Sequence, residues 1–212
     1  MASLLLADDH YIVKRGLKLI IQSFMPGSKI DEADDGDSCF EKIKNNNYDL
    51  LILDVNMPRT DSFVLVSNIL ALKPETKILM FSMNDEEVYA RRFLKMGAMG
   101  YLKKDEPEVE IKKAITTILN NKKYVSHGLN QILVEDLFNN NPENPFDILS
   151  PREFEIVQHL IRGESIARIC QNFNLHSSTV GTHKARIFEK LHCSNIIDLN
   201  SLAKAHNIIF PT

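Results

Sequence analysis

Six side chains that can handle a phosphate group follow short apolar runs of the sequence. In chain order they are Asp8 and Asp9, Asp54, Ser82, and Lys103 with Lys104. Clustered carboxylates repel one another unless a cation neutralises them, and an all-oxygen set suits Mg²⁺ (or Mn²⁺), which also binds phosphate oxygens. A lysine adds positive charge for an incoming phosphoryl group. Because a carboxylate can act as a nucleophile, the pattern predicts Mg²⁺-dependent phosphoryl transfer onto Asp54.

Five short apolar runs must bring these residues together. The runs are Leu4–Ala7, Ile30–Ala33, Leu50–Val55, Ile78–Ser82 and Gly100–Lys103. Each is too short for a helix and is typical of a strand, while the segments between them space apolar residues three and four apart, as helices do. The alternation predicts an α/β fold with a parallel sheet covered on both faces. The carboxyl ends of its strands would gather the phosphate-handling residues at one edge.

The pattern changes after Tyr124. Residues 128–138 predict a short helix, and the polar, proline-bearing stretch 139–145 predicts a linker. The remaining sequence predicts four helices, at about 151–162, 165–172, 177–191 and 196–206. Ser150, Pro151 and Glu153 have the types and spacing of a capping box at the start of the first of these helices.

Composition limits the class of protein. The chain has 212 residues, 44% hydrophobic and 25% charged, which predicts one large or two small globular domains. A net charge of −3 excludes a uniformly basic coat, although residues 146–212 sum to +1. Three cysteines without a CxxC pair argue against a disulfide framework and a structural zinc site. With no apolar run of about 20 residues and no signal peptide, we expect a cytoplasmic protein without a membrane partner.

Residues 1–124 resemble the receiver domain of bacterial two-component response regulators. Three strings carry the resemblance: Ala7-Asp8-Asp9-His10, Asp54-Val55-Asn56-Met57-Pro58, and Gly97-Ala98-Met99-Gly100-Tyr101-Leu102-Lys103-Lys104-Asp105. The resemblance implies a flavodoxin-like (βα)5 fold in which Asp54 accepts phosphate from a sensor histidine kinase. It also implies that Asp9, Asp54 and the backbone carbonyl of Asn56 ligate Mg²⁺ (or Mn²⁺) directly, and that Asp8 does so through water.

The same resemblance implies a switch. Ser82 corresponds to the hydroxyl that turns toward the phosphoryl group, and Tyr101 to the aromatic side chain that changes rotamer with it. Lys104 lies three residues after this aromatic and corresponds to the family's lysine, with Lys103 as its neighbour. Ser62 stands where the family usually has glycine. Serine can cap a helix but tolerates positive φ less well, so we expect a loop of different shape there.

Residues 149–208 resemble the LuxR-type helix-turn-helix domain of NarL-like regulators. The matching residues are Leu149-Ser150-Pro151-Arg152-Glu153, Glu155-Ile156-Val157, Gly163, Ile169, Thr179-Val180, His183, Ile187 and Lys190-Leu191. The resemblance implies that the helix 177–191 enters the major groove of promoter DNA. The expected domains are therefore a receiver at 1–124, a linker at 125–146 and a helix-turn-helix domain at 147–212.

The expected recognition helix is poor in positive charge. Val180, Ile187 and Leu191 predict its buried face, and the candidate DNA contacts are Thr179, Thr182, His183, Lys184, Arg186 and Lys190. The opposite face comprises Ser178, Gly181, Thr182, Ala185, Arg186 and Glu189. Gly181 replaces a basic residue usual in the family, and His176 replaces the usual N-cap serine, with Ser177 as an alternative cap. We expect weak binding by a monomer and a homodimer on paired half-sites when active.

The leading hypothesis is a DNA-binding transcriptional response regulator switched by phosphorylation of Asp54. One alternative keeps the switch but makes the helix-turn-helix mainly a protein-interaction module with weak DNA binding. Another, a hydrolase of the aspartyl-phosphate type, needs a carboxylate two residues after the nucleophile, and Asn56 cannot act as a general acid. We therefore expect no enzyme, only a receiver that catalyses its own phosphoryl transfer and dephosphorylation.

Overall fold

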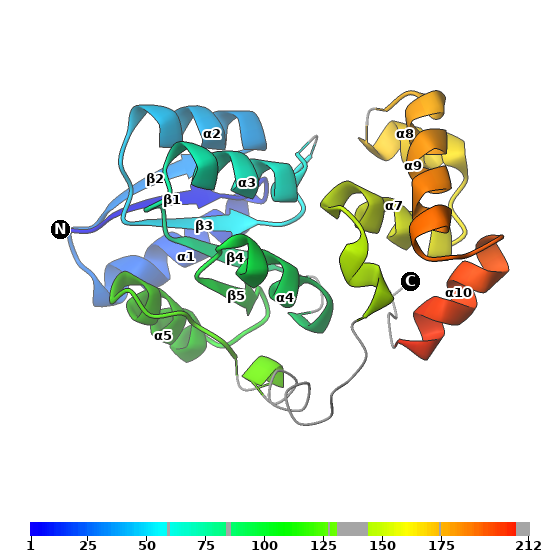
Figure 1. Cartoon of the computed structure of the whole chain (residues 1–212). Coiled ribbons are helices and arrows are strands. Elements are labelled where there is room, and N and C mark those ends of the chain that lie inside the picture. Colours follow the sequence, from blue (N-terminus) through cyan, green and yellow to red (C-terminus); the bar gives the residue numbers. More distant parts are fainter. Residues whose placement is uncertain (59, 84–85, 127, 131–143, 174, 207–212) are drawn as a thin grey trace. The chain divides into compact units, whose positions relative to one another are not determined.

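The chain forms two compact units, Met1–Asn139 and Asn140–Thr212, whose elements are labelled in Figure 1. The structure is a computed structural model and describes residues 1–58, 60–83, 86–126, 128–130, 144–173 and 175–206. Within these ranges no helix combines the length and the apolar character that a membrane crossing needs.

The first unit is built on a five-stranded parallel sheet. Its strands are β1 (Ser3–Ala7), β2 (Lys29–Ala33), β3 (Leu50–Asp54), β4 (Ile78–Ser82) and β5 (Gly100–Lys103), in the order β2-β1-β3-β4-β5. This confirms the predicted α/β fold. Two strand ends differ by one residue from the apolar runs: β2 begins one residue earlier, and β3 ends at Asp54.

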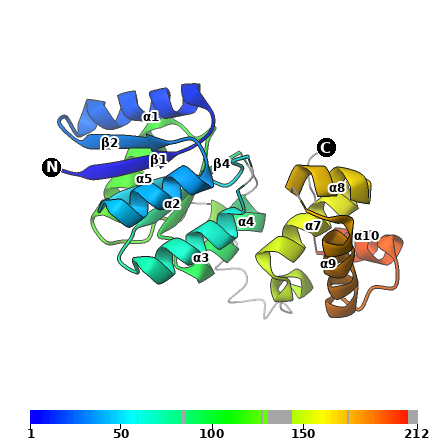
Figure 2. The ribbon, with the colours of Figure 1, turned by 90° about the horizontal axis from the view of Figure 1, so that it is seen from above.

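Helices cover both faces of the sheet (Figure 2). On one face lie α1 (Tyr11–Phe24) and α5 (Glu108–Leu119), and on the other lie α2 (Gly36–Asn45), α3 (Ser62–Leu72) and α4 (Glu86–Met96). Gly97, with a φ of 114°, follows α4 directly, as predicted for a helix stop.

Successive residues of a strand pack on opposite faces, because side chains alternate along β structure. Leu4 and Leu6 of β1 lie in one core cluster with Leu17 and Ile115 of the flanking helices. The adjacent residue Leu5 lies in the other cluster, which includes Phe63, Phe93 and Tyr101. A shift of one residue would expose or misplace every one of these side chains, so the register of the central strands is fixed. The positions of their carboxyl ends are fixed with it.

The second unit is helical, as predicted. A 3₁₀ turn, η1 (Pro145–Ile148), precedes α7 (Pro151–Ile161), α8 (Ile166–Phe173), α9 (Ser177–Lys190) and α10 (Ile196–Ala205). At the start of α7 the Ser150 hydroxyl accepts from the amide of Glu153, and the Glu153 carboxylate accepts from the amide of Ser150. Both bonds of the predicted capping box are therefore present.

Residues after the last helix of the sheet domain still contact the first unit. The backbone amide of Tyr124 donates to the Met99 carbonyl at 2.8 Å, and Leu129 is buried in the core cluster that contains Phe63. The Ser126 hydroxyl donates to the Glu86 carboxylate at 2.6 Å. The linker predicted at 139–145 and most of the helix predicted at 128–138 lie outside the described residues, as does Asn174 between α8 and α9.

Candidate functional site

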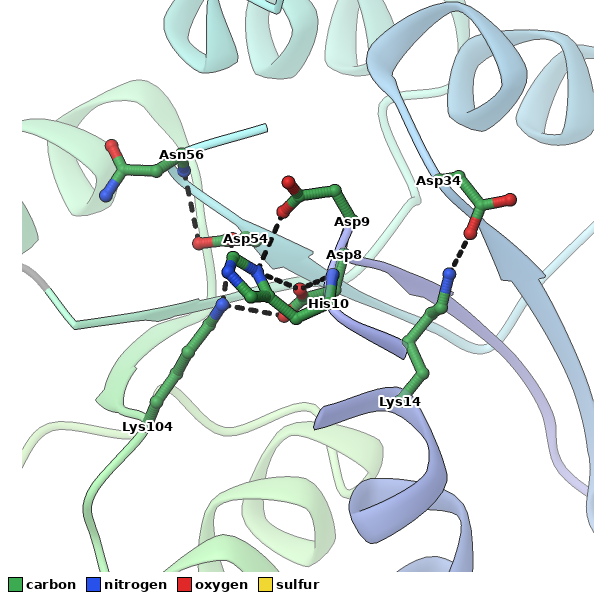
Figure 3. A network of polar contacts seen from close by, with 8 residues as sticks. All are labelled: Asp8, Asp9, His10, Lys14, Asp34, Asp54, Asn56 and Lys104. Atoms are coloured by element: carbon green, nitrogen blue, oxygen red, sulfur yellow. Dashed lines mark hydrogen bonds and ion pairs between the residues drawn. The ribbon is translucent and has the colours of Figure 1, made fainter. Parts of the chain in front are cut away.

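Two buried aspartates lie side by side at the carboxyl edge of the sheet (Figure 3). Asp8 follows β1 and Asp54 ends the neighbouring strand β3, and they are 3% and 2% exposed. Together with Asp9 and His10 they can place four ligand atoms within 4.8 Å of one another. The three carboxylates form an acidic pocket typical of a Mg²⁺ site.

Lys104 is the cation that the structure brings to this pocket. Its Nζ lies 2.7 Å from Asp8 Oδ2 and 2.8 Å from Asp54 Oδ2, and its own side chain is buried. Burial opposes the charge on Lys104, but its bonds to the two carboxylates outweigh that effect and raise the pKa of the ammonium group. Lys103 lies elsewhere, with Nζ 3.9 Å from Asp105 and a side chain that is 36% exposed.

The charge of the pocket fits a divalent cation. Three carboxylates and one ammonium leave a formal charge of −2 when His10 is neutral. Burial raises the pKa of the Asp54 carboxyl, while hydrogen bonds from Lys104 and from the Asn56 amide act in the opposite direction. That amide donates to Asp54 Oδ1 at 3.1 Å, which fixes the loop after β3 against the carboxylate. The donor set is therefore suited to Mg²⁺ or Mn²⁺, with oxygen ligands and excess negative charge.

The two expected switch residues are both buried on adjacent strands. Ser82 ends β4 and pairs in register with Lys103 of β5, and the amide of Lys104 donates to the Ser82 carbonyl at 2.9 Å. Tyr101 is fully buried, with its ring 6.4 Å from that of Phe93 in α4. Ser82 is thus connected through the backbone to Lys104, and Tyr101 to the helix that covers the sheet.

Two residues at this edge escaped the sequence analysis. His10 Nδ1 lies 3.1 Å from Asp8 Oδ1 and 2.9 Å from Asp9 Oδ1. Lys14, in the first turn of α1, is buried and forms an ion pair with Asp34 after β2 (Figure 3). The signal for His10 was its place directly after Asp8-Asp9, whereas nothing in the spacing of Lys14 and Asp34 indicates that they meet.

Ser62 differs from both expectations for it. Asp61 caps α3 by accepting from the amides of Phe63 and Val64, so Ser62 is the first helical residue, not the cap. Ser62 does not have positive φ, and its buried hydroxyl has no hydrogen-bond partner among the described residues. The loop is held from the other side, where Thr60 Oγ1 accepts from the amide of Gly36 at 2.9 Å.

The helix expected to contact DNA, α9, presents the polar face that was predicted. Val180, Ile187 and Leu191 are buried, and the residues opposite them are exposed: Ser178, Gly181, Thr182, Ala185, Arg186 and Glu189. The helix begins at Ser177, with His176 at the N-cap and no side-chain capping bond, so the alternative cap at Ser177 does not form.

The basic residues of α9 have different surroundings. Lys190 Nζ lies 2.6 Å from the buried carboxylate of Glu153, and Lys184 Nζ lies 5.4 Å from the ring centroid of Phe188. Arg186 lines a surface hollow whose other lining residues are Ser178, Thr179, Thr182 and His183. Burial lowers the pKa of His183, which favours its neutral form.

Comparisons with known proteins match each unit to a family. Residues 4–116 match the response regulator receiver domain, and residues 147–203 match the bacterial regulatory proteins of the luxR family. The chain is 32% identical over 196 residues to the oxygen regulatory protein NreC of Staphylococcus carnosus, with 89% of this chain and 90% of that protein covered. Both matched families are regulatory, so the chain is a regulator and not an enzyme with a separate substrate.

Two solved structures resemble the chain. RcsB of Salmonella enterica serovar Typhimurium, bound to the promoter rprA with a phosphomimetic, is similar with a TM-score of 0.66 and 20% identity over 97% of this chain and all of that chain. A LuxR-family response regulator of Aurantimonas has a TM-score of 0.60 and 26% identity, covering 65% of this chain and 98% of that chain. The chain therefore belongs to the two-component response regulators that join a receiver to a LuxR-type DNA-binding domain.

Proposed function

We propose that Asp54 accepts a phosphoryl group from a phosphohistidine of a sensor histidine kinase. One Asp54 oxygen forms a bond to phosphorus as the phosphorus–nitrogen bond breaks, and the histidine nitrogen leaves with the electron pair. The observation that carries the proposal is the buried cluster in which Lys104 contacts both Asp8 and Asp54. Lys104 would follow the transferred group by exchanging a carboxylate partner for a phosphoryl oxygen.

In this proposal the remaining acidic residues hold Mg²⁺ or Mn²⁺. Asp9, Asp54 and the Asn56 carbonyl would be direct ligands, and Asp8 would act through water. The bound ion would neutralise the phosphoryl oxygens during transfer. The formal charge of −2 in the pocket supports this assignment.

Phosphorylation would then bias the receiver between two states. Ser82 would turn toward the phosphoryl group, and Tyr101 would change rotamer at the face formed by β5 and its neighbouring helices. The result would be release of the DNA-binding domain or formation of a homodimer that binds paired half-sites in promoter DNA. A cytoplasmic location follows from the need to reach both DNA and the kinase.

Labelling by acetyl phosphate tests the acceptor. With Mg²⁺ present, the full chain is expected to gain one acid-labile phosphoryl group by intact mass, and Asp54→Asn is expected to gain none. Asp37→Asn is the matched control, because Asp37 is exposed in the first turn of α2, and it should label as the unmodified chain does. Stoichiometric labelling of Asp54→Asn would exclude Asp54 as the acceptor.

The second candidate function is a protein-interaction role for the helix-turn-helix domain. It is favoured by the engagement of Lys190 with Glu153 and of Lys184 with Phe188, which removes charge from the face available to phosphates. Titration of phosphorylated full chain with duplex DNA at 50 and 200 mM salt separates the two. DNA binding predicts an affinity that falls with salt, and the interaction module predicts no binding at either concentration.

We further propose the domain limits 1–124 for the receiver, 125–146 for the linker and 147–212 for the DNA-binding domain. The buried side chain of Leu129 indicates that the first residues of this linker pack on the receiver. The two compact units support the division without placing its ends.

A further inference from the structure

The exposed face of α9 offers methyl groups where a groove-reading helix often offers hydrogen-bond donors. The Thr182 hydroxyl donates to the carbonyl of Ser178 at 2.9 Å, within the same helix. Its hydrogen is therefore unavailable to a base acceptor such as guanine O6 or adenine N7. What Thr182 can still present to a base edge is its methyl group and an acceptor oxygen.

Ala185 continues this face by one turn. It is exposed, so its small size is not imposed by the core of the unit. At Gly181, also on this face, a built Cβ would meet no atom within 4 Å, so packing does not explain the missing side chain either. The middle of the helix thus exposes two methyl groups, and neither is required there by the fold.

Positive charge lies beside this face instead of on it. Lys190 is bonded to Glu153, and Lys184 lies over the ring of Phe188. Arg186 is exposed and lines the hollow next to Thr182. A guanine contact usually takes a bidentate arginine or lysine, whereas alanine and the threonine methyl are suited to the C5-methyl group of thymine.

We propose that Thr182 and Ala185 are specificity-determining residues that contact thymine methyl groups in the major groove, with Arg186 supplying the adjacent phosphate or base contact. The inference rests on the DNA-binding function proposed above and adds the class of sequence that is read. It assigns an operator with thymines at the positions facing the middle of α9.

The test begins with selection of duplexes from a randomised pool by the full chain, phosphorylated with acetyl phosphate and Mg²⁺. Selected sites are expected to carry A·T pairs in the centre of each half-site. The thymines of the best duplex are then replaced one at a time by deoxyuridine, which removes only the C5-methyl. Loss of one buried methyl predicts about a fourfold weaker affinity at one or two of these positions.

Two variants locate the protein partner of each methyl. Thr182→Ser removes one methyl and keeps the hydroxyl that bonds to Ser178, and Ala185→Gly removes the other. In each variant the penalty for deoxyuridine at its own position should disappear, because the protein methyl that made the contact is gone. Thr116→Ser, at an exposed position of α5, is the matched control and should keep the full penalty.

Three results would overturn the proposal. The first is equal affinity of the unmodified chain for thymine and deoxyuridine duplexes. The second is a deoxyuridine penalty that both variants retain in full, which would assign the methyl contacts to other residues. The third, failure of the phosphorylated chain to select any duplex, would overturn the DNA-binding function itself, so the two failures are distinguishable.

Discussion

Lys104 holds two buried carboxylates of like charge together. Asp8 and Asp54 lie at the ends of adjacent strands, and Lys104 is within 2.8 Å of an oxygen on each. Removing the ammonium would leave two neighbouring negative charges in a site shielded from water, which costs free energy. The same residue that serves phosphate binding in the proposed function therefore also stabilises the resting receiver.

We expect Lys104→Met to lower the free energy of unfolding by about 1–3 kcal/mol. Millimolar Mg²⁺ should restore part of this loss, because the divalent ion supplies the missing positive charge. Urea unfolding of the full chain with and without Mg²⁺ measures both effects. Lys103→Met, at a half-exposed position, should stay within about 0.5 kcal/mol of the unmodified chain. Equal stability of the two variants would contradict the neutralising role of Lys104.

Ser62 provides a residue-scale prediction of opposite sign. Its hydroxyl is fully buried without a partner among the described residues, and an unsatisfied buried polar group destabilises the fold. Ser62→Ala should raise the free energy of unfolding by about 1 kcal/mol in the same urea experiment. Ser67→Ala, exposed on α3, is the control and should change little. A loss of stability in Ser62→Ala would show that the hydroxyl has a partner.

At the scale of elements, Glu153 joins two helices. It completes the capping box of α7 through Ser150 and accepts a bond from Lys190 of α9 at 2.6 Å. Burial of Glu153 favours its neutral form, but the bonds from Lys190 and Ser150 outweigh burial and lower the pKa of the carboxyl. The carboxylate thus stabilises the start of one helix and its packing against the recognition helix.

The lowered pKa of Glu153 predicts a pH dependence of stability. The contribution of the carboxylate is fully present above the unfolded pKa of about 4.3 and is lost as pH falls through the lower folded pKa. Glu153→Gln should therefore destabilise the second unit by about 1–2 kcal/mol at pH 7. The difference from the unmodified chain should shrink at pH 3.

Urea unfolding followed by circular dichroism at both pH values measures the effect of Glu153→Gln. Glu189→Gln is the control, since Glu189 is exposed on α9 and faces away from the core. An equal effect of Glu153→Gln at pH 7 and pH 3 would indicate that the charge of the carboxylate is not what stabilises the junction.

At the scale of the whole molecule, the chain is two compact units with different chemistry. The first gathers carboxylates around an ammonium at a sheet edge, and the second exposes a polar helix with few available cations. The sequence between them, with three asparagines and two prolines in residues 139–145, has no apolar side chains to bury in a core.

Brief digestion of the full chain with subtilisin is expected to cut first between residues 139 and 145. Intact-mass analysis should then find two resistant fragments, because each unit has its own buried core. Fragments that begin or end inside β1–β5 or α7–α10 before any cut in this stretch would contradict the division.

The sequence by itself determined the order of strands and helices, the acidic pocket and the polar face of α9. Apolar runs and helical spacing are local signals, and the ends of parallel strands meet at one edge in any such sheet. Asp8 and Asp54 could therefore be brought together on paper. The capping box at Ser150 and the buried line of Val180, Ile187 and Leu191 followed from spacing in the same way.

The tertiary structure alone decided contacts made by long side chains across the fold. It brought Lys104 instead of Lys103 to Asp54, placed His10 between Asp8 and Asp9, and paired Lys190 with Glu153. A flexible lysine or histidine can reach several partners from one backbone position, so its partner depends on burial and charge around it. Sequence periodicity fixes which face a residue occupies, but the charge it meets there is fixed only by packing.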